Sequence, residues 1–343
     1  MVHTLSVCLV TATMITSVSS MGRFTTVPAD VDGELDYDGP PDCAFRSSVA
    51  VGTKVVFVPR GVNDVGIFDT VTNTFSTVNT NMTMGLKFSG GTAVGTKVVF
   101  APLNADDVGI FNTATNKFYT RDTSMTMESK FFGATAVGTK VVFTPYDANV
   151  VGVFDTETNT FSTVDTELTE AMFSGATAVG TKVVFAPAMP DGVGVFDTAT
   201  NKFSAVDTGL NDAQFALFDS TVAVGTKVVL IPYDVDVVGV FDTETDTFSA
   251  VNTALTMKDR FTGAIAVGTK VVFPPCISDV VGILDLSPSP TPPSNNENPD
   301  LGLIIGLTVG GAVVLGGLVY YFYFARVNKV QSPIAFPFQK LVF

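Results

Sequence analysis

The sequence contains one histidine, no tryptophan and three cysteines in 343 residues. The histidine is His3, so a chain that lost its N-terminal segment would contain no imidazole. Catalytic triads with a histidine base and imidazole metal sites are then excluded. Basic residues are also scarce, because 19 Lys and Arg stand against 33 Asp and Glu. An acidic surface repels phosphates, so we expect no nucleic-acid partner.

Charge is missing altogether from two apolar runs, one near each end of the chain. Residues 1–20 contain no Lys, Arg, Asp or Glu, and Ser17, Ser19 and Ser20 are small enough for signal-peptidase cleavage. This run is short for a membrane span, so it predicts a signal peptide over residues 1–20. The alternatives are a buried strand or an anchor.

The second run, residues 301–325, would span about 37 Å as a helix, which is enough to cross a bilayer. Arg326 and Lys329 follow it at once, which places the tail 326–343 in the cytosol and the preceding chain outside. Residues 287–300 are rich in Pro, Ser and Asn and predict an extended stalk. We therefore expect a single-pass type I membrane protein of the secretory pathway, at the cell surface.

Small residues recur on one stripe of this predicted span. Gly302, Gly306 and Gly310 are spaced by four residues, which allows a second helix to approach closely. The stripe predicts self-association in the membrane. The alternative is that these glycines carry no such role, since glycine is common in membrane helices.

The rest of the chain is an internal repeat with a period of 42 to 45 residues. A VGTK string begins each copy, a phenylalanine stands six residues earlier, and a glycine stands fifteen residues later. The strings begin at Val51, Val94, Val137, Val179, Val224 and Val267, the phenylalanines are Phe45, Phe88, Phe131, Phe173, Phe218 and Phe261, and the glycines are Gly66, Gly109, Gly152, Gly194, Gly239 and Gly282.

Each period contains four short strand patterns separated by turn residues, and no helical periodicity. Four antiparallel strands in about 43 residues match one blade of a β-propeller. The VVF strands are apolar on both faces, as expected if each blade lies between two neighbours. The sequence therefore predicts an all-β, six-bladed β-propeller over residues 21–286.

The sixth copy enters the stalk before its fourth strand. Residues 22–27 (GRFTTV) match the fourth-strand columns of residues 73–78 (NTFSTV). We therefore predict that the N-terminal strand completes the last blade and closes the ring.

The unit "ATAVGTKVVFAP" followed by "VGVFDTATNKF" resembles the kelch repeat, although phenylalanine stands where kelch repeats usually have tryptophan. It is also similar to YVTN-type propeller repeats, which remain the near alternative. Both resemblances imply a propeller. Neither implies one function, because functions vary widely within each family.

An acid or its amide stands twelve residues after the first valine of every copy, in the loop between the second and third strands. The residues are Asn63, Asp106, Asn149, Asp191, Asp236 and Asp279. One interpretation is a polar rim that binds a cation or a polyhydroxylated ligand. The other is that Asn and Asp shape tight turns. At the opposite face, the lysines of the VGTK turns would form a ring of solvated charges.

Three further features predict local chemistry. Cys43 and Cys276 fall at one face of neighbouring blades in a closed ring, which predicts a disulfide; the alternative is two buried free thiols. The alternating carboxylates Asp30, Asp32, Glu34, Asp36 and Asp38 are a candidate calcium site, with a solvated acidic loop as the alternative. No other cofactor is expected. Asn81 begins a glycosylation sequon in an exposed connection.

These features favour a cell-surface recognition or adhesion module whose propeller face binds an extracellular protein or glycan. We expect no enzyme activity and assign no catalytic residue. One alternative is an enzyme that acts on extracellular carbohydrate with Asp and Glu only. The other is a structural spacer of a cell coat or an endomembrane.

Overall fold

The computed structural model describes residues 25–28, 43–169, 171–190, 192–210, 217–255, 261–276 and 280–288. Residues 1–288 form one compact unit. Within the described ranges the chain consists of strands, turns and loops, and it contains no helix long and apolar enough to cross a membrane. The predicted signal peptide 1–20, the acidic loop Asp30 to Asp38 and the predicted span 301–325 lie outside these ranges.

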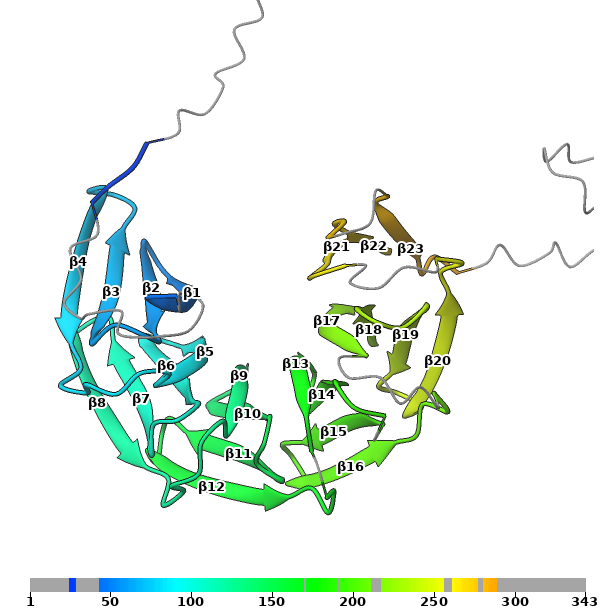
Figure 1. Cartoon of the computed structure of the whole chain (residues 1–343), viewed down its shortest axis with the longest axis horizontal. Coiled ribbons are helices and arrows are strands. Elements are labelled where there is room, and N and C mark those ends of the chain that lie inside the picture. The colour runs from blue at the N-terminus through cyan, green and yellow to red at the C-terminus, as the bar shows by residue number, and fades with distance from the viewer. Residues whose placement is uncertain are drawn as a thin grey trace, which may run out of the picture. The chain divides into compact units, whose positions relative to one another are not determined.

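The strands form a series of antiparallel sheets, one for each sequence repeat (Figure 1). The first three sheets contain β1 (Phe45–Val51), β2 (Lys54–Pro59), β3 (Asp64–Asp69) and β4 (Thr74–Asn79); β5 (Phe88–Val94), β6 (Lys97–Pro102), β7 (Asp107–Asn112) and β8 (Lys117–Asp122); and β9 (Phe131–Val137), β10 (Lys140–Pro145), β11 (Val150–Asp155) and β12 (Thr160–Asp165).

The next three sheets continue the series. They contain β13 (Phe173–Val179), β14 (Lys182–Pro187), β15 (Val193–Asp197) and β16 (Lys202–Val206); β17 (Phe218–Val224), β18 (Lys227–Pro232), β19 (Val237–Asp242) and β20 (Thr247–Asn252); and β21 (Ile265–Val267), β22 (Lys270–Phe273) and β23 (Gly282–Asp285). The predicted repeat of four strands is thus confirmed in five sheets, and the sixth has three strands in the described residues.

Turn chemistry explains where the strands end. The first hairpin of each sheet closes at the VGTK string, where Val51 pairs with Lys54 and Gly52 has a φ of 58°. Such a φ strains any residue with a Cβ atom, so glycine stands there. A side chain stabilises the turn between the third and fourth strands. In the first sheet, Asp69 Oδ1 accepts hydrogen bonds from the amides of Val71 and Thr72.

Each sheet presents an aliphatic face to the next sheet and an aromatic face to the previous one. Between the first two sheets, Val56, Val58 and Ile67 of the first pack against Phe88 and Phe100 of the second. The same arrangement recurs along the series. These interfaces bury the VVF strands on both sides, as their continuous apolar pattern predicts.

Three aromatic rings fill the centre of most sheets. In the third sheet, the rings of Phe131 and Phe143 lie 5.6 Å apart, and each lies within 6.4 Å of Phe161 from the fourth strand. A Cβ atom on Gly152 would approach all three rings, the nearest at 2.8 Å. The repeated glycine is therefore required by ring packing.

Four of the six turn lysines donate a hydrogen bond to the neighbouring sheet, which corrects the expectation of a solvated ring for those four. Lys227 and Lys270 pair instead with an aspartate of their own sheet. The Nζ atom of Lys54 donates to the carbonyl of Thr113 in the next sheet, at 3.1 Å. Lys140 donates in the same way to Thr198, and Lys182 to Thr243, at 2.9 and 2.8 Å. Each bond joins the second strand of one sheet to the turn of its neighbour.

The first strands pack in the order β1, β5, β9, β13, β17 and β21, and Figure 1 shows them along the inner side of a curved series. The predicted closure by a strand of residues 22–27 is not confirmed. In the described residues β23 pairs with β22 alone, and residues 25–28 form no strand. The predicted bridge between Cys43 and Cys276 is absent, because no disulfide forms and both residues are exposed.

Candidate functional site

The residue that follows the repeated phenylalanine differs in chemical type from one repeat to the next, whereas the neighbouring columns repeat. We call these positions the axial column, and they hold Arg46, Ser89, Phe132, Ser174, Asp219 and Thr262. The phenylalanine before each of these residues has a similar environment in most repeats, because five of the six rings are almost fully buried. The axial column therefore combines a rigid backbone with varied chemistry.

Five members of the axial column line one pocket of about 500 Å³, which we call the axial pocket. Five of the six sheets contribute to it. Its lining residues are Arg46, Phe132, Tyr146, Met172, Ser174, Ala188, Phe218, Asp219, Tyr233 and Thr262. Arg46 belongs to the first sheet and Thr262 lies three residues before the start of β21, so both ends of the series reach this pocket.

An aromatic wall forms one side of the axial pocket. The rings of Phe132 and Tyr146 are stacked with centroids 5.2 Å apart. The guanidinium carbon of Arg46 lies 5.3 Å from the centroid of Phe132. A cation above a ring face is held by the quadrupole of the ring, so Arg46 is positioned on this wall. The wall offers a flat apolar surface with one fixed positive charge.

The lining of the axial pocket also includes a carboxylate. Asp219 Oδ2 accepts hydrogen bonds from the amide of Gly263 at 3.0 Å and from the hydroxyl of Ser220 at 3.1 Å. These bonds fix the carboxylate between the fifth sheet and the segment before β21. The hydroxyl of Ser174 donates to the carbonyl of Phe218 and joins the fourth sheet to the fifth. The axial pocket therefore combines an aromatic wall with the hydrogen-bonded carboxylate of Asp219.

A second pocket of about 280 Å³ shares Tyr146 and Met172 with the axial pocket, and we call it the side lobe. Asp147, Asn149 and Thr169 supply its polar lining. Asn149 shapes this lobe, since its amide nitrogen donates to Thr169 at 3.0 Å and its oxygen accepts from the amide of Ala171 at 3.1 Å. A ligand in the axial pocket can thus extend outward between the third and fourth sheets.

The predicted rim residues serve mainly as turn formers. Their backbone carbonyls accept hydrogen bonds from both the amide and the hydroxyl of the threonine that follows the fourth strand, and the described pairs are Asn63 with Thr80, Asp106 with Thr123, Asn149 with Thr166, and Asp236 with Thr253. Asp191 and Asp279 lie outside the described residues. Of the four described, Asn149 alone lines the side lobe, and none lines the axial pocket.

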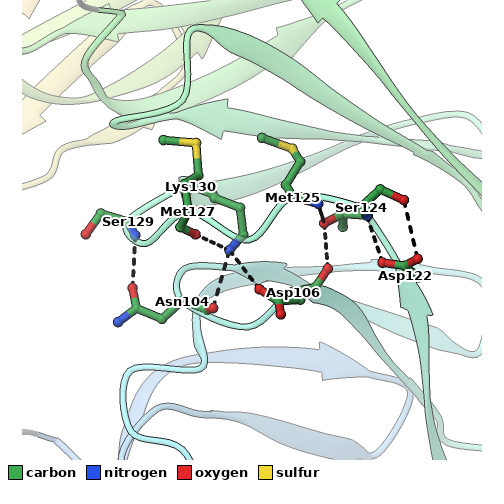
Figure 2. A network of polar contacts seen from close by, with 9 residues as sticks. Asn104, Asp106, Asp122, Ser124, Met125, Met127, Ser129 and Lys130 are labelled. Atoms are coloured by element: carbon green, nitrogen blue, oxygen red, sulfur yellow. Dashed lines mark hydrogen bonds and ion pairs between the residues drawn. The ribbon is translucent and has the colours of Figure 1, made fainter.

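Asp106 has an additional role, because it faces a buried lysine (Figure 2). Lys130 is fully buried, and its Nζ atom donates to the carbonyls of Met127 at 2.5 Å and Asn104 at 3.3 Å. The Asp106 carboxylate lies 4.0 Å from the same nitrogen. Burial lowers the pKa of Lys130, and the nearby carboxylate opposes that shift. This cluster fastens the connection between β8 and β9, so it is structural.

The remaining predicted sites have the following positions. Asn81 is exposed in the connection between β4 and β5, with a φ of 58°. The described residues contain no group of three or more Asp, Glu, His or Cys that could hold a metal ion. The calcium candidates Asp30, Asp32, Glu34, Asp36 and Asp38, and the glycines Gly302, Gly306 and Gly310, lie outside those residues.

The axial pocket was not among the sites that the sequence predicts. The sequence does contain a signal for this pocket, because one position varies within otherwise similar repeats. The residue after the repeated phenylalanine is arginine, serine, phenylalanine, aspartate or threonine. The prediction rested on the repeated Asp and Asn residues instead. A residue type that recurs in every blade is more typical of a turn than of a single asymmetric site.

No protein-family model and no curated protein sequence matches the chain. Solved structures do match. A computationally designed protein, Ika8, aligns with a TM-score of 0.56 at 15% identity over 70% of both chains. Virginiamycin B lyase from Staphylococcus aureus aligns with a TM-score of 0.54 at 13% identity, over 65% of this chain and 73% of the lyase.

A chain of the mitotic checkpoint complex aligns with a TM-score of 0.54 at 12% identity, over 83% of this chain and 86% of that one. Likeness at such identities shows the fold alone. Together with the series of antiparallel sheets, it shows that this protein has the β-propeller fold, built from repeated four-stranded sheets.

Proposed function

We propose that this protein is an extracellular recognition module that binds a protein or glycan ligand at the axial pocket. One observation carries the proposal. The positions that vary between otherwise similar repeats converge on one pocket, which is lined by an aromatic wall, by Arg46 and by Asp219. Aromatic and arginine side chains dominate the energetics of recognition sites, and a carboxylate adds direction.

Binding is favoured over hydrolysis by the charges in the pocket. A glycosidase of the usual kind needs two carboxyl groups that flank the scissile bond. Among the described residues that line the axial pocket, Asp219 is the one carboxylate, and it is engaged by Gly263 and Ser220. The site therefore supports positioning of a ligand rather than acid-base catalysis.

The finer architecture is part of the same proposal. We infer a closed six-bladed ring with kelch-like repeats, and the contribution of both Arg46 and Thr262 to one pocket supports it. We also propose secretion through the peptide 1–20 and anchoring by the span 301–325, with the propeller outside the cell. This topology would present the axial pocket to extracellular partners.

The proposal predicts that Phe132→Ala weakens ligand binding. Removing the ring deletes the stack on Tyr146 and frees Arg46, so we expect a loss of affinity of about tenfold or more. The soluble fragment 22–286 would be screened on a glycan array and in pull-downs from extracellular proteins. Affinity for the ligand found would then be measured for the variant.

Ser162→Ala is the matched control, because Ser162 is exposed on β12 of the same sheet. It should leave binding unchanged. Asp219→Asn tests the carboxylate of the pocket and should also weaken binding. Equal affinity of the Phe132→Ala fragment and the unaltered fragment would refute a site at the axial pocket.

A further inference from the structure

Two opposite charges line the axial pocket without pairing with each other. Arg46 and Asp219 both contribute to its lining, yet within the described residues no ion pair or hydrogen bond joins them. Arg46 is held on the ring of Phe132, with its guanidinium carbon 5.3 Å from the ring centroid. The amide of Gly263 and the hydroxyl of Ser220 hold Asp219. The two charges are therefore kept apart in one pocket of about 500 Å³.

The guanidinium of Arg46 is the less satisfied of the two groups. Arg46 is exposed, and in the part of the chain that the structure describes its side chain makes no hydrogen bond or ion pair. A guanidinium has five N–H donors in a planar fork that matches a carboxylate. Asp219 uses Oδ2 for both of its hydrogen bonds to described residues, which leaves Oδ1 as an acceptor. A complementary ligand therefore brings an anion to Arg46 and a hydrogen-bond donor to Asp219.

The side lobe continues the axial pocket with a different charge. The two share the side chains of Tyr146 and Met172. Asp147 is an exposed carboxylate of the lobe, and the described residues that line the lobe include no Lys or Arg. The carboxylate repels an anion there, whereas a hydroxyl group can donate to it. A ligand that spans both pockets is therefore acidic at the Arg46 end and neutral at the lobe end.

Sugar units fit this combination of flat apolar surface and separate acceptors. A pyranose ring has an apolar face of C–H groups and a rim of hydroxyl groups. The rings of Phe132 and Tyr146 offer an apolar surface to such a face. The carboxylates of Asp219 and Asp147 need several donors on the ligand. A sugar unit carries several hydroxyl donors, whereas a peptide residue carries one backbone donor, so a glycan is favoured over an acidic peptide.

The net charge of the protein does not prevent an acidic ligand from binding. The chain has a formal charge of −14, which repels anions at long range. Salt screens this repulsion beyond about 8 Å at physiological ionic strength. A hydrogen bond between a guanidinium and a carboxylate is roughly twice as strong as one between neutral groups. The contact at Arg46 therefore decides which charge the ligand carries.

We propose that the axial pocket binds a sugar unit that carries a carboxylate. The carboxylate binds Arg46, a hydroxyl group of the same unit donates to Asp219 Oδ1, and a neutral neighbouring sugar occupies the side lobe. This ligand class rests on the recognition function proposed above and specifies it. Uronic acids and sialic acids share the required chemistry.

Binding of acidic oligosaccharides to the full chain tests the proposal. The probes are glucuronate and galacturonate oligosaccharides and sialyllactose, each compared with the same oligosaccharide whose carboxyl group has been reduced to an alcohol. At least one acidic probe should bind about tenfold more tightly than its reduced form, because the alcohol cannot make the charge-assisted contact. The probe that binds distinguishes a uronic acid from a sialic acid.

Variants then locate the preference for the acidic form. Arg46→Gln should abolish it, and Arg46→Lys should keep part of it, because the charge remains without the planar fork. Arg121→Gln is the matched control, since the guanidinium carbon of Arg121 lies 5.2 Å from the ring centroid of Tyr119 and Arg121 does not line the axial pocket. It should leave both affinities unchanged. Asp219→Asn should weaken binding of the acidic and reduced forms alike.

Several results would overturn this ligand class and keep the recognition function. They are equal affinity for an acidic probe and its reduced form, an acid preference that Arg46→Gln retains, and binding of a neutral glycan or a peptide when no acidic probe binds. In each of these cases, Phe132→Ala would still weaken binding of the ligand found. If no glycan and no protein binds the full chain, the ligand class and the recognition function are both wrong.

Discussion

At the scale of single residues, the repeated glycine leaves the space that the aromatic rings of its sheet occupy. A side chain at Gly109 would place its Cβ atom 2.7 Å from Phe88 and 3.0 Å from Phe100. Real Cβ atoms do not approach other carbons so closely, so the rings or the strand must move. The repeated glycine therefore stands where the aromatic rings pack against the third strand of each sheet.

Gly109→Ala should therefore destabilise the protein by about 1 to 3 kcal/mol, because overpacking displaces buried rings. Gly85→Ala is the control, since a Cβ atom there meets no atom within 4 Å. It should be neutral or slightly stabilising. Thermal and urea unfolding of the two variants measures the difference, and equal stabilities would contradict the packing role of Gly109.

At the scale of the element, the hairpin between the third and fourth strands is held by one side chain. Asp197 Oδ1 accepts a hydrogen bond from the amide of Ala199 at 2.9 Å, and this bond is the main cause of its lowered pKa. In the second sheet Asn112 makes the same contacts with the amides of Ala114 and Thr115. The turn thus needs an oxygen acceptor, and a negative charge strengthens it.

These turns predict acid sensitivity. The folded pKa values of Asp69, Asp197, Asp242 and Asp285 lie below the ordinary value, so the unfolded chain binds protons first as the pH falls. Their stabilisation is present above about pH 4 and is lost below it. Melting temperatures between pH 6 and pH 2 should show this fall, and Asp197→Asn should reduce it. A fall as large in Asp197→Asn as in the unaltered protein would exclude Asp197 as a contributor.

At the scale of the whole molecule, one interface is used again and again along the series. Each aliphatic face packs on the aromatic face of the next sheet, and the turn lysines Lys54 and Lys140 form hydrogen bonds between the same pairs of sheets. Such a series leaves one face of each kind at its two ends. The aliphatic face of the sixth sheet is accordingly exposed, with Ile265 and Val267 both 63% exposed.

The proposed topology places the propeller in the lumen of the secretory pathway, where Asn81 meets the glycosylation machinery. Asn81 is exposed, as glycan attachment requires. Expression of the full chain in a eukaryotic secretory host should give a product whose mass falls on treatment with an N-glycosidase. Asn81→Gln should give the lower mass without treatment. A product insensitive to the glycosidase would count against this topology.

The sequence by itself determined the repeated unit, the strand boundaries and the all-β class, because period, turn glycines and alternating polarity are local signals. Only the tertiary structure decided three other matters. Four of the six lysines of the VGTK strings form hydrogen bonds between sheets, and Cys43 and Cys276 have no disulfide between them. The tertiary structure also brought Arg46, Phe132 and Asp219 into one pocket. Those outcomes depend on how sheets far apart in the chain pack together, and a local pattern carries no information on such distances.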